Sequence, residues 1–306
     1  MAEHPHHGHD HGHRHGHDHR HAAPAPGGAL RAAAGVTIAF ALVEALGGWW
    51  TGSLALLSDA GHMLTDGAAL MLGAAAAWMA RRPPSHRHSY GLGRAEVLAA
   101  LVNAAAMLLI ALGLAYEALV RMESPKPVNG AAAALIALVG LVLNLWVMGR
   151  LAPHHHDLNA RAARLHVLGD ALGSIAALAS GTLIAIGGWN LVDPIASLAI
   201  CLLIGVSALR LLRESLHALM EGVPHGLSVE AIGAEMASVE GVLSVHDLHV
   251  WTLSGSRAAL SAHVMVRSLQ HWDKTLHALQ TRLHEKFGID HVTLQPETGT
   301  RPLVRH

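Results

Sequence analysis

The chain has 306 residues, of which 52% are hydrophobic and only 14% are charged, and its net charge is −1. Soluble domains carry about 25% charged residues, so much of this chain is expected to lie in lipid. A near-neutral net charge gives no indication of a nucleic-acid partner. A single cysteine, Cys201, excludes an internal disulfide and a thiolate metal cluster, so His, Asp and Glu must supply any metal ligands.

The first 28 residues are a segment of low complexity. They contain ten histidines, mostly in His-Gly-His and His-Asp-His repeats, followed by Ala-Pro-Ala-Pro-Gly-Gly. Such a composition cannot bury a core, so residues 1–28 are predicted to form a disordered, metal-binding tail.

Six apolar segments follow, several of them uncharged runs of about the length that a bilayer demands. They predict a transmembrane domain over residues 29–217, with helices at 29–51, 54–80, 94–121, 129–151, 158–187 and 191–217. Arginines gather in the loop between the second and third helices and around the loop between the fourth and fifth. The positive-inside rule therefore predicts that both termini are cytoplasmic.

From about residue 222 the pattern changes to short elements. A helix at 227–239, strands at 242–253 and 258–266, a helix near 272–287 and a strand at 290–296 are expected. The order α-β-β-α-β predicts a small open sheet with two helices on one face. The predicted fold class is an α-helical membrane protein with an α+β domain at residues 222–300.

Two matching His-x-x-x-Asp patterns lie inside predicted membrane helices, His62 with Asp66 and His166 with Asp170. Residues i and i+4 share one helix face, and an aspartate at bilayer depth costs roughly 2.5–3.5 kcal/mol on insertion scales. Alternating topology makes the two helices antiparallel, as in an inverted repeat, so each histidine is expected to face the other helix's aspartate. Two nitrogens and two oxygens form a tetrahedral shell suited to Zn²⁺, and two carboxylates balance its charge. Two unrelated polar pairs that stabilise helix contacts are the alternative.

Other polar residues lie in the same helices. Asp59 shares a face with His62 and Asp66, and is either a proton or metal relay or a polar group at the outer mouth. Glu44, Asn103 and Asn144 are further polar groups at membrane depth, and helix–helix hydrogen bonding is the favoured interpretation for the two asparagines.

Histidines outside the membrane helices give weaker candidates. His86 and His88, in the basic loop, can bind a peripheral ion, as exposed histidines do whether or not the binding is useful. In the C-terminal domain His246 and His263 can meet across paired strands, with Glu297 on the third strand; free histidines on a polar sheet face are the alternative. His249 follows His246 by three positions, so the two face opposite sides unless a bulge intervenes.

Several stretches match the motifs of one family in the same order: Ser53–His62, Tyr90–Asn103, His166–Asp170, Leu219–Pro224 and His246–Trp251. On these residues the chain from about 31 to 300 resembles the cation diffusion facilitator family of zinc transporters. The resemblance implies a homodimer of six-helix protomers with cytoplasmic ferredoxin-like domains that bind zinc and dimerise. It also implies exchange of cytosolic divalent metal for protons.

The resemblance places the transport site on His62, Asp66, His166 and Asp170, and the cytoplasmic metal site on His246, His263 and Glu297. Members with Asp at the position of His62 accept a broader range of metals, so this histidine favours zinc. Some members have a histidine where this chain has Gln295, which argues against a two-metal cytoplasmic cluster.

The expected function is proton-coupled Zn²⁺ efflux in a bacterial cytoplasmic membrane, with zinc as substrate and regulatory ion, rather than enzymatic catalysis. Efflux of cobalt, nickel or cadmium is one alternative, because N/O ligands bind those ions too. A metal-sensing receptor that does not transport is another. An intramembrane metalloprotease is disfavoured, because the chain has no His-Glu-x-x-His helix and the four ligands leave no open metal position.

Overall fold

The computed structural model describes residues 27–151, 158–254 and 257–299, and within these ranges the side chains of 27–34, 150–151, 158–166 and 254 are outside the description. Nearly all of the predicted tail at 1–28 is therefore outside the described residues. The backbone of His166 is described, but its side chain is not.

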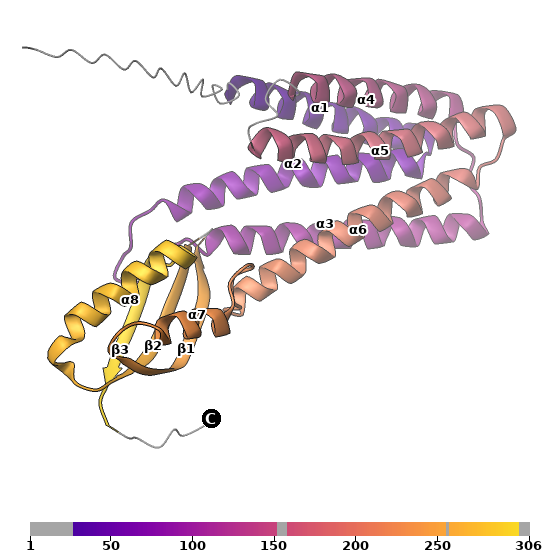
Figure 1. Cartoon of the computed structure of the whole chain (residues 1–306). Coiled ribbons are helices and arrows are strands. Elements are labelled where there is room, and N and C mark those ends of the chain that lie inside the picture. The colour runs from indigo at the N-terminus through magenta and orange to yellow at the C-terminus, as the bar shows by residue number, and fades with distance from the viewer. Residues whose placement is uncertain (1–26, 152–157, 255–256, 300–306) are drawn as a thin grey trace, which may run out of the picture.

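Six long helices form the first part of the molecule (Figure 1). They are α1 (Gly27–Thr51), α2 (Leu54–Ala80), α3 (Ala95–Glu123), α4 (Gly130–Leu151), α5 (Leu158–Gly187) and α6 (Val192–Leu219). Within the described residues, α2 to α6 are long and apolar enough to cross a membrane, and 35–51 of α1 forms a shorter apolar helix. The predicted helical membrane architecture is confirmed, with each helix boundary within two residues of its expected position.

Helix α2 lies at the centre of the bundle. It contacts α1, α3, α5 and α6, while α3 pairs with α6 and α4 pairs with α5. Its first half, from Leu54 to Gly67, is largely buried, whereas the turns after Gly67 are mostly exposed. Polar groups in the first half of α2 are therefore enclosed by neighbouring helices.

A buried carboxylate, Asp193, fixes the start of α2 against the start of α6. It accepts hydrogen bonds from Ser53 Oγ (2.6 Å), Leu54 N (2.6 Å) and Ala55 N (3.3 Å). The first amides of a helix have no partner within the helix, and an anion stabilises that end. Asp193 therefore anchors the helix that presents His62 and Asp66.

The chain continues into a small α+β domain (Figure 1). Its elements are α7 (Val229–Ala237), β1 (Val242–Ser254), β2 (Arg257–Val266), a short 3-10 helix (Leu269–His271), α8 (Trp272–Phe287) and β3 (His291–Glu297). The strand order is β1-β2-β3, with β1 antiparallel and β3 parallel to β2. The predicted order α-β-β-α-β is confirmed.

Alternation along β2 determines the two faces of this sheet. Its buried residues pack with two helices in one core, which comprises Leu260, Ala262, Val264 and Val266 from β2, Ile232 and Met236 from α7, and Leu279 and Leu283 from α8. Side chains of a strand alternate between faces, so His263 points to the face that the helices leave open.

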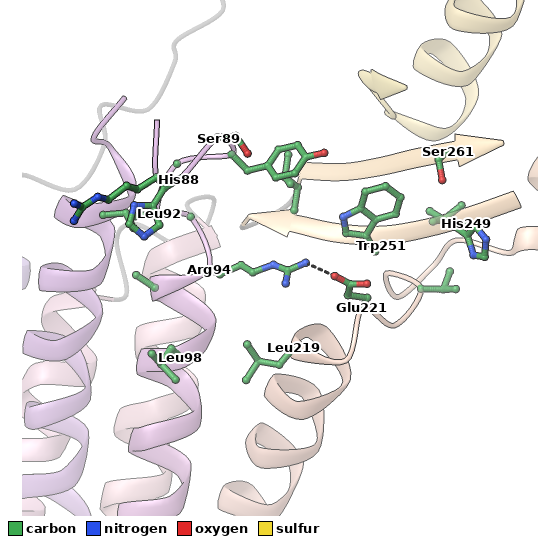
Figure 2. A pocket seen from close by; sticks show the side chains of 18 of the residues that line it. His88, Ser89, Leu92, Arg94, Leu98, Leu219, Glu221, His249, Trp251 and Ser261 are labelled. Carbon is green, nitrogen blue, oxygen red and sulfur yellow. Dashed lines mark hydrogen bonds and ion pairs between the residues drawn. The ribbon is translucent and has the colours of Figure 1, made fainter. Parts of the chain in front are cut away.

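The helical bundle and the α+β domain meet at a pocket of about 1030 Å³. Figure 2 shows Arg94, before α3, in an ion pair of 3.0 Å with Glu221, after α6, while Trp251 and His249 approach from β1. Tyr90, in the loop between α2 and α3, contacts the His291 ring edge-on, with 5.5 Å between centroids. The α2–α3 loop and the α+β domain therefore lie at the same end of the bundle.

We expect Asp193→Ala to destabilise the bundle, because three buried donors lose their acceptor. The cost is on the order of 3 kcal/mol, and it should appear as a lower melting temperature of the detergent-solubilised protein by circular dichroism. Asp273→Ala, at an exposed position of α8, is the matched control. Equal melting temperatures for the two variants would show that the α2 amides find other acceptors.

Candidate metal centres

Three potential ligands converge from α2 and α5 inside the bundle. His62 Nδ1 lies 3.5 Å from Asp66 Oδ2, and His62 Nε2 lies 3.8 Å from Asp170 Oδ1. The three ligand atoms that these side chains offer all lie within 4.8 Å of one another. Because a bound Zn²⁺ holds its nitrogen and oxygen ligands at about 2 Å, small side-chain rotations can bring all three onto one ion.

The three ligands differ in how far their side chains are exposed to solvent. The side chains of His62 and Asp66 are 19% and 14% exposed, whereas that of Asp170 is 1% exposed. His166, the fourth predicted ligand, is one turn before Asp170 on α5, and its side chain is outside the described residues. The structure thus brings three of the four predicted residues together, and the membership of His166 stays a prediction.

Behind the ligands, a chain of polar groups links α4, α5 and α2. Asn144 Nδ2 donates to Ser174 Oγ (3.2 Å), and Ser174 Oγ donates to Asp59 Oδ2 (3.0 Å). Helix α5 can approach this closely because Gly173 has no side chain; a Cβ there would lie 2.2 Å from Asp59 Oδ1. The helix–helix bond predicted for Asn144 is confirmed, but Asn103 contacts Met107 Sδ of its own helix at 3.4 Å.

Sequence reasoning did not place Glu44 in this cluster. Its side chain is fully buried, neither carboxyl oxygen has a hydrogen-bond partner among the described residues, and it is within electrostatic range of Asp59 and Asp170. An isolated acid in an apolar helix is the only signal in the sequence that could have found it, because its neighbours come from other helices.

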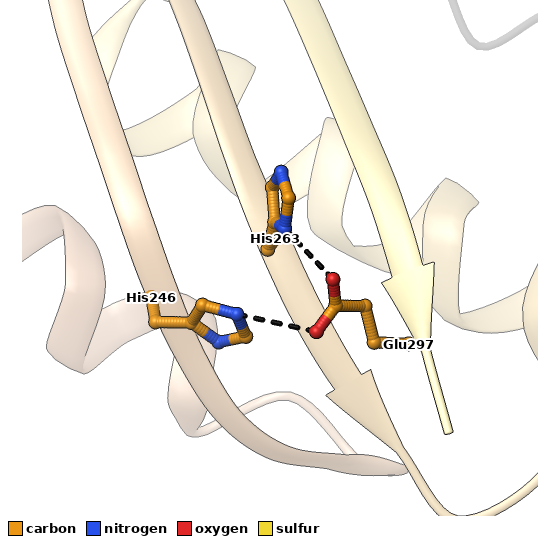
Figure 3. Close-up of side chains that lie close together, drawn as sticks. All are labelled: His246, His263 and Glu297. Atoms are coloured by element: carbon orange, nitrogen blue, oxygen red, sulfur yellow. Dashed lines mark hydrogen bonds and ion pairs between the residues drawn. The ribbon is translucent and has the colours of Figure 1, made fainter. Parts of the chain in front are cut away.

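A second group of potential ligands lies on the open face of the sheet. Figure 3 shows His246 from β1, His263 from β2 and Glu297 from β3 pointing toward one another. Glu297 Oε2 lies 3.2 Å from His246 Nε2, and Glu297 Oε1 lies 2.9 Å from His263 Nδ1. The cross-strand meeting expected for these residues is present, and two imidazoles with one carboxylate are a donor set that suits Zn²⁺.

A β-bulge changes the expected position of His249. The register shifts between His246, opposite His263, and His249, opposite Ser261. Since His263 and Ser261 share a face of β2, the bulge places both β1 histidines on that face. Asp247, in the bulge with φ of 51°, approaches His249 Nε2 to 2.9 Å and His263 Nε2 to 3.7 Å. The hydrogen bond from His249 lowers the pKa of the Asp247 carboxyl below its ordinary value.

The loop histidines are less well supported. Among the side chains that the structure describes, only the two groups above bring three or more potential metal ligands together. His86 and His88 belong to neither group, although His88 lines the pocket between the bundle and the α+β domain. A peripheral ion at these residues stays a prediction.

Comparison with known proteins assigns both parts of the chain to one family. Residues 30–220 match the family model of the cation efflux transmembrane domain, and residues 224–299 match that of the cation efflux protein cytoplasmic domain. These matches cover the helical bundle and the α+β domain, and so include both groups of ligands.

Curated relatives match over most of their length. Zinc transporter ZitB of Escherichia coli (strain K12) is 42% identical over 271 residues, which is 86% of this chain and 85% of that protein. The cadmium, cobalt and zinc/H(+)-K(+) antiporter of Bacillus subtilis (strain 168) is 39% identical over 265 residues, 85% of each chain. A solved structure, the metal-bound C-terminal domain of the CzcD transporter, is 33% identical and covers 23% of this chain and 99% of that chain. Its TM-score of 0.22 is too low to support a fold comparison.

We expect His263→Ala to weaken zinc binding on the open sheet face at least tenfold. Removing a residue that only hydrogen-bonds to a metal ligand already lowers metal affinity about 10–100-fold, and His263 is expected to be a ligand itself. Calorimetric titration of a chain that begins at residue 27 measures this without the histidine tract. His277→Ala, at an exposed position of α8, is the control. Identical isotherms for the two variants would exclude His263 as a ligand.

Proposed function

This chain belongs to the cation efflux family, and we propose that it exports Zn²⁺ from the cytoplasm across the cytoplasmic membrane in exchange for protons. The family models match both parts of the chain, and a relative 42% identical is named a zinc transporter. The multi-pass helical architecture agrees with this role.

The convergence of His62, Asp66 and Asp170 is the single observation on which the proposal depends. Two carboxylates and an imidazole from different helices meet within 4.8 Å inside an apolar bundle. Four ionisable groups at membrane depth are a large cost for packing alone. A transported dication, ligated by these three groups and by His166, neutralises the two carboxylates and accounts for that cost.

Proton exchange follows from the chemistry of the same ligands. Imidazole and carboxylate groups must be deprotonated to bind metal, so protons and Zn²⁺ compete for the site. An empty site with two carboxylates in low dielectric is unfavourable. We infer that the empty site takes up protons before it reorients, which couples outward zinc to inward protons.

A broader cation range is the second candidate. The Bacillus subtilis relative is named for cadmium and cobalt as well as zinc, and N/O sites bind several divalent ions. A receptor that senses metal without transporting it remains the alternative from another class, and flux distinguishes it from a transporter.

We propose that the protein works as a homodimer and that its α+β domain, at the cytoplasmic end, holds a regulatory zinc ion. The match of residues 224–299 to the family's cytoplasmic domain supports the location, and the meeting of His246, His263 and Glu297 supports the metal site. With an even number of membrane passes both termini lie on the same side, and the arginine-rich loops favour the cytoplasm as that side. There the histidine-rich tail can concentrate metal near the entrance.

We expect Asp170→Asn to abolish zinc transport while the protein still inserts and folds, because an anionic ligand is lost from a buried site. Purified protein in vesicles loaded with a zinc dye, with an imposed pH gradient, measures the flux. Asp273→Asn, exposed in α8, should transport normally. Flux at the wild-type rate through Asp170→Asn would remove this residue from the site.

We expect His62→Asp to raise Mn²⁺ transport relative to Zn²⁺, because a carboxylate is a harder ligand than imidazole and suits harder ions. The same vesicle assay across Zn²⁺, Cd²⁺, Co²⁺, Ni²⁺ and Mn²⁺ gives the rank order. An unchanged rank order would mean that His62 does not set selectivity.

A further inference from the structure

Two buried carboxyl groups next to the transport ligands are not used by the proposed metal site. Glu44 on α1 and Asp59 on α2 are each 0% exposed. In the part of the chain that the structure describes, both oxygens of Glu44 and Oδ1 of Asp59 lack a hydrogen-bond partner. An ionised carboxylate without partners in an apolar interior is very costly, so each group must hold a proton or a cation.

Four helices enclose this pair. Phe40, one turn before Glu44 on α1, packs against the backbone of Gly140 on α4. Ser174 of α5 lies beside the same glycine, because a Cβ built at Gly140 would be 3.4 Å from Ser174 Oγ. Asp59 of α2 is bonded to the same Ser174. Because Ser174 accepts from Asn144 and donates to Asp59 Oδ2, Oδ1 is the Asp59 oxygen left to bear a proton.

The pair lies on the closed side of the ligands. Along α2, Asp66 is nearest the exposed half of the helix, His62 follows, and Asp59 is nearest the buried start that Asp193 anchors. The exposed half leads toward the α2–α3 loop and the α+β domain, at the cytoplasmic end. Asp59 therefore lies between the ligands and the opposite end of the bundle. Because Gly48 of α1 lies against Leu57 of α2, and Gly67 of α2 against Ile38 of α1, the antiparallel register places Glu44 between the levels of Asp59 and His62.

We propose that Glu44 and Asp59 form a proton-transfer site that takes up protons from the outer side and passes them to the transport ligands, without binding the metal. The inference rests on the proposed function, zinc–proton exchange. In the transfer, an O–H bond of one carboxyl breaks as the proton forms a new O–H or N–H bond on a ligand carboxylate or imidazole. A hydronium ion from the outer side then returns a proton to the carboxylate and leaves as water. No electrons are exchanged.

The neighbouring groups favour a proton over a metal ion. Asp170 of α5 interacts electrostatically with both members of the pair. His62 and Asp66 lie on the same face of α2 as Asp59 by their helical spacing, and residues 130–149 of α4 contain no titratable side chain. No lysine or arginine of the described part of these helices is available to neutralise the pair. Neither Glu44 nor Asp59 belongs to a group of three ligand atoms within 4.8 Å among the described residues.

The test compares Glu44→Gln and Asp59→Asn with wild type in vesicles. Zinc flux is measured twice, with a zinc gradient at uniform pH and with an added gradient that is acid on the outer side. Zinc binding of the same full-length variants is measured by calorimetry. Glu44→Asp keeps the carboxyl group, and Ser180→Ala removes a buried hydroxyl of α5 outside the cluster, so both serve as controls.

Both neutral variants should bind as much zinc as wild type yet lose most of the stimulation by the pH gradient, and Glu44→Asp should retain it. Wild-type stimulation in both neutral variants, or loss of one zinc ion from the calorimetric stoichiometry, would overturn the inference. Absence of zinc flux in wild type, or normal flux in Asp170→Asn, would instead overturn the proposed function. If one variant does not fold, the other gives the same comparison.

Discussion

The cost of negative charge in a low-dielectric interior is the constraint on which the rest of this structure depends. Asp170, Asp59 and Glu44 are all fully buried where α1, α2, α4 and α5 approach one another. Helices can enclose so many acids only if other groups compensate them. Ser174 and Asn144 compensate one oxygen of Asp59, and glycine at 173 lets α5 come close enough for that bond. Within the described residues, both oxygens of Glu44 and Oδ1 of Asp59 have no hydrogen-bond partner, so these oxygens require a proton or a cation, which is the chemistry of cation–proton exchange.

The α+β domain brings similar ligands together by different means. Its ligands come from three adjacent strands, so the sheet register brings them together rather than helix packing. The open face lets water reach His246, His263 and Glu297, which are 18–31% exposed. Desolvation is weak there, so a metal ion can enter and leave directly from the solvent. A shell of this kind suits a regulatory ion that follows the cytoplasmic concentration, whereas the enclosed site suits an ion that must be released on the other side.

Local periodicity explains why so much was predictable from the sequence. Helix boundaries, the strand order and the i, i+4 pairs each depend on residues close in the chain, and the α2 pair does meet Asp170 across the bundle. Three features escaped because side-chain packing or a local backbone irregularity, rather than periodicity, decides them. Glu44 is an isolated acid whose neighbours come from α2 and α5. Asn103 and Asn144 look alike in sequence, yet Asn144 donates to Ser174 of another helix whereas Asn103 donates to Met107 of its own helix. The bulge at Asp247, which turns His249 to the face of His246, uses a positive φ at a residue other than glycine.

Because Glu44 and Asp59 are separate from the metal ligands, the buried site can keep its electrical charge balanced while Zn²⁺ is exchanged for protons. With Zn²⁺ bound, Asp66 and Asp170 cancel its charge, so the other two acids are tolerable only in their neutral form. When the metal leaves, the two ligand carboxylates lose its two positive charges. Two protons must then bind among the ligands to keep the site neutral. A carboxyl pair that is already protonated and lies on the closed side is placed to supply them as soon as that side opens. Because α2 carries His62, Asp66 and Asp59 and contacts four of the other helices, one movement of α2 can expose the ligands and the pair together. Charge neutrality in both states then links metal release to proton entry without a direct contact between the two ions.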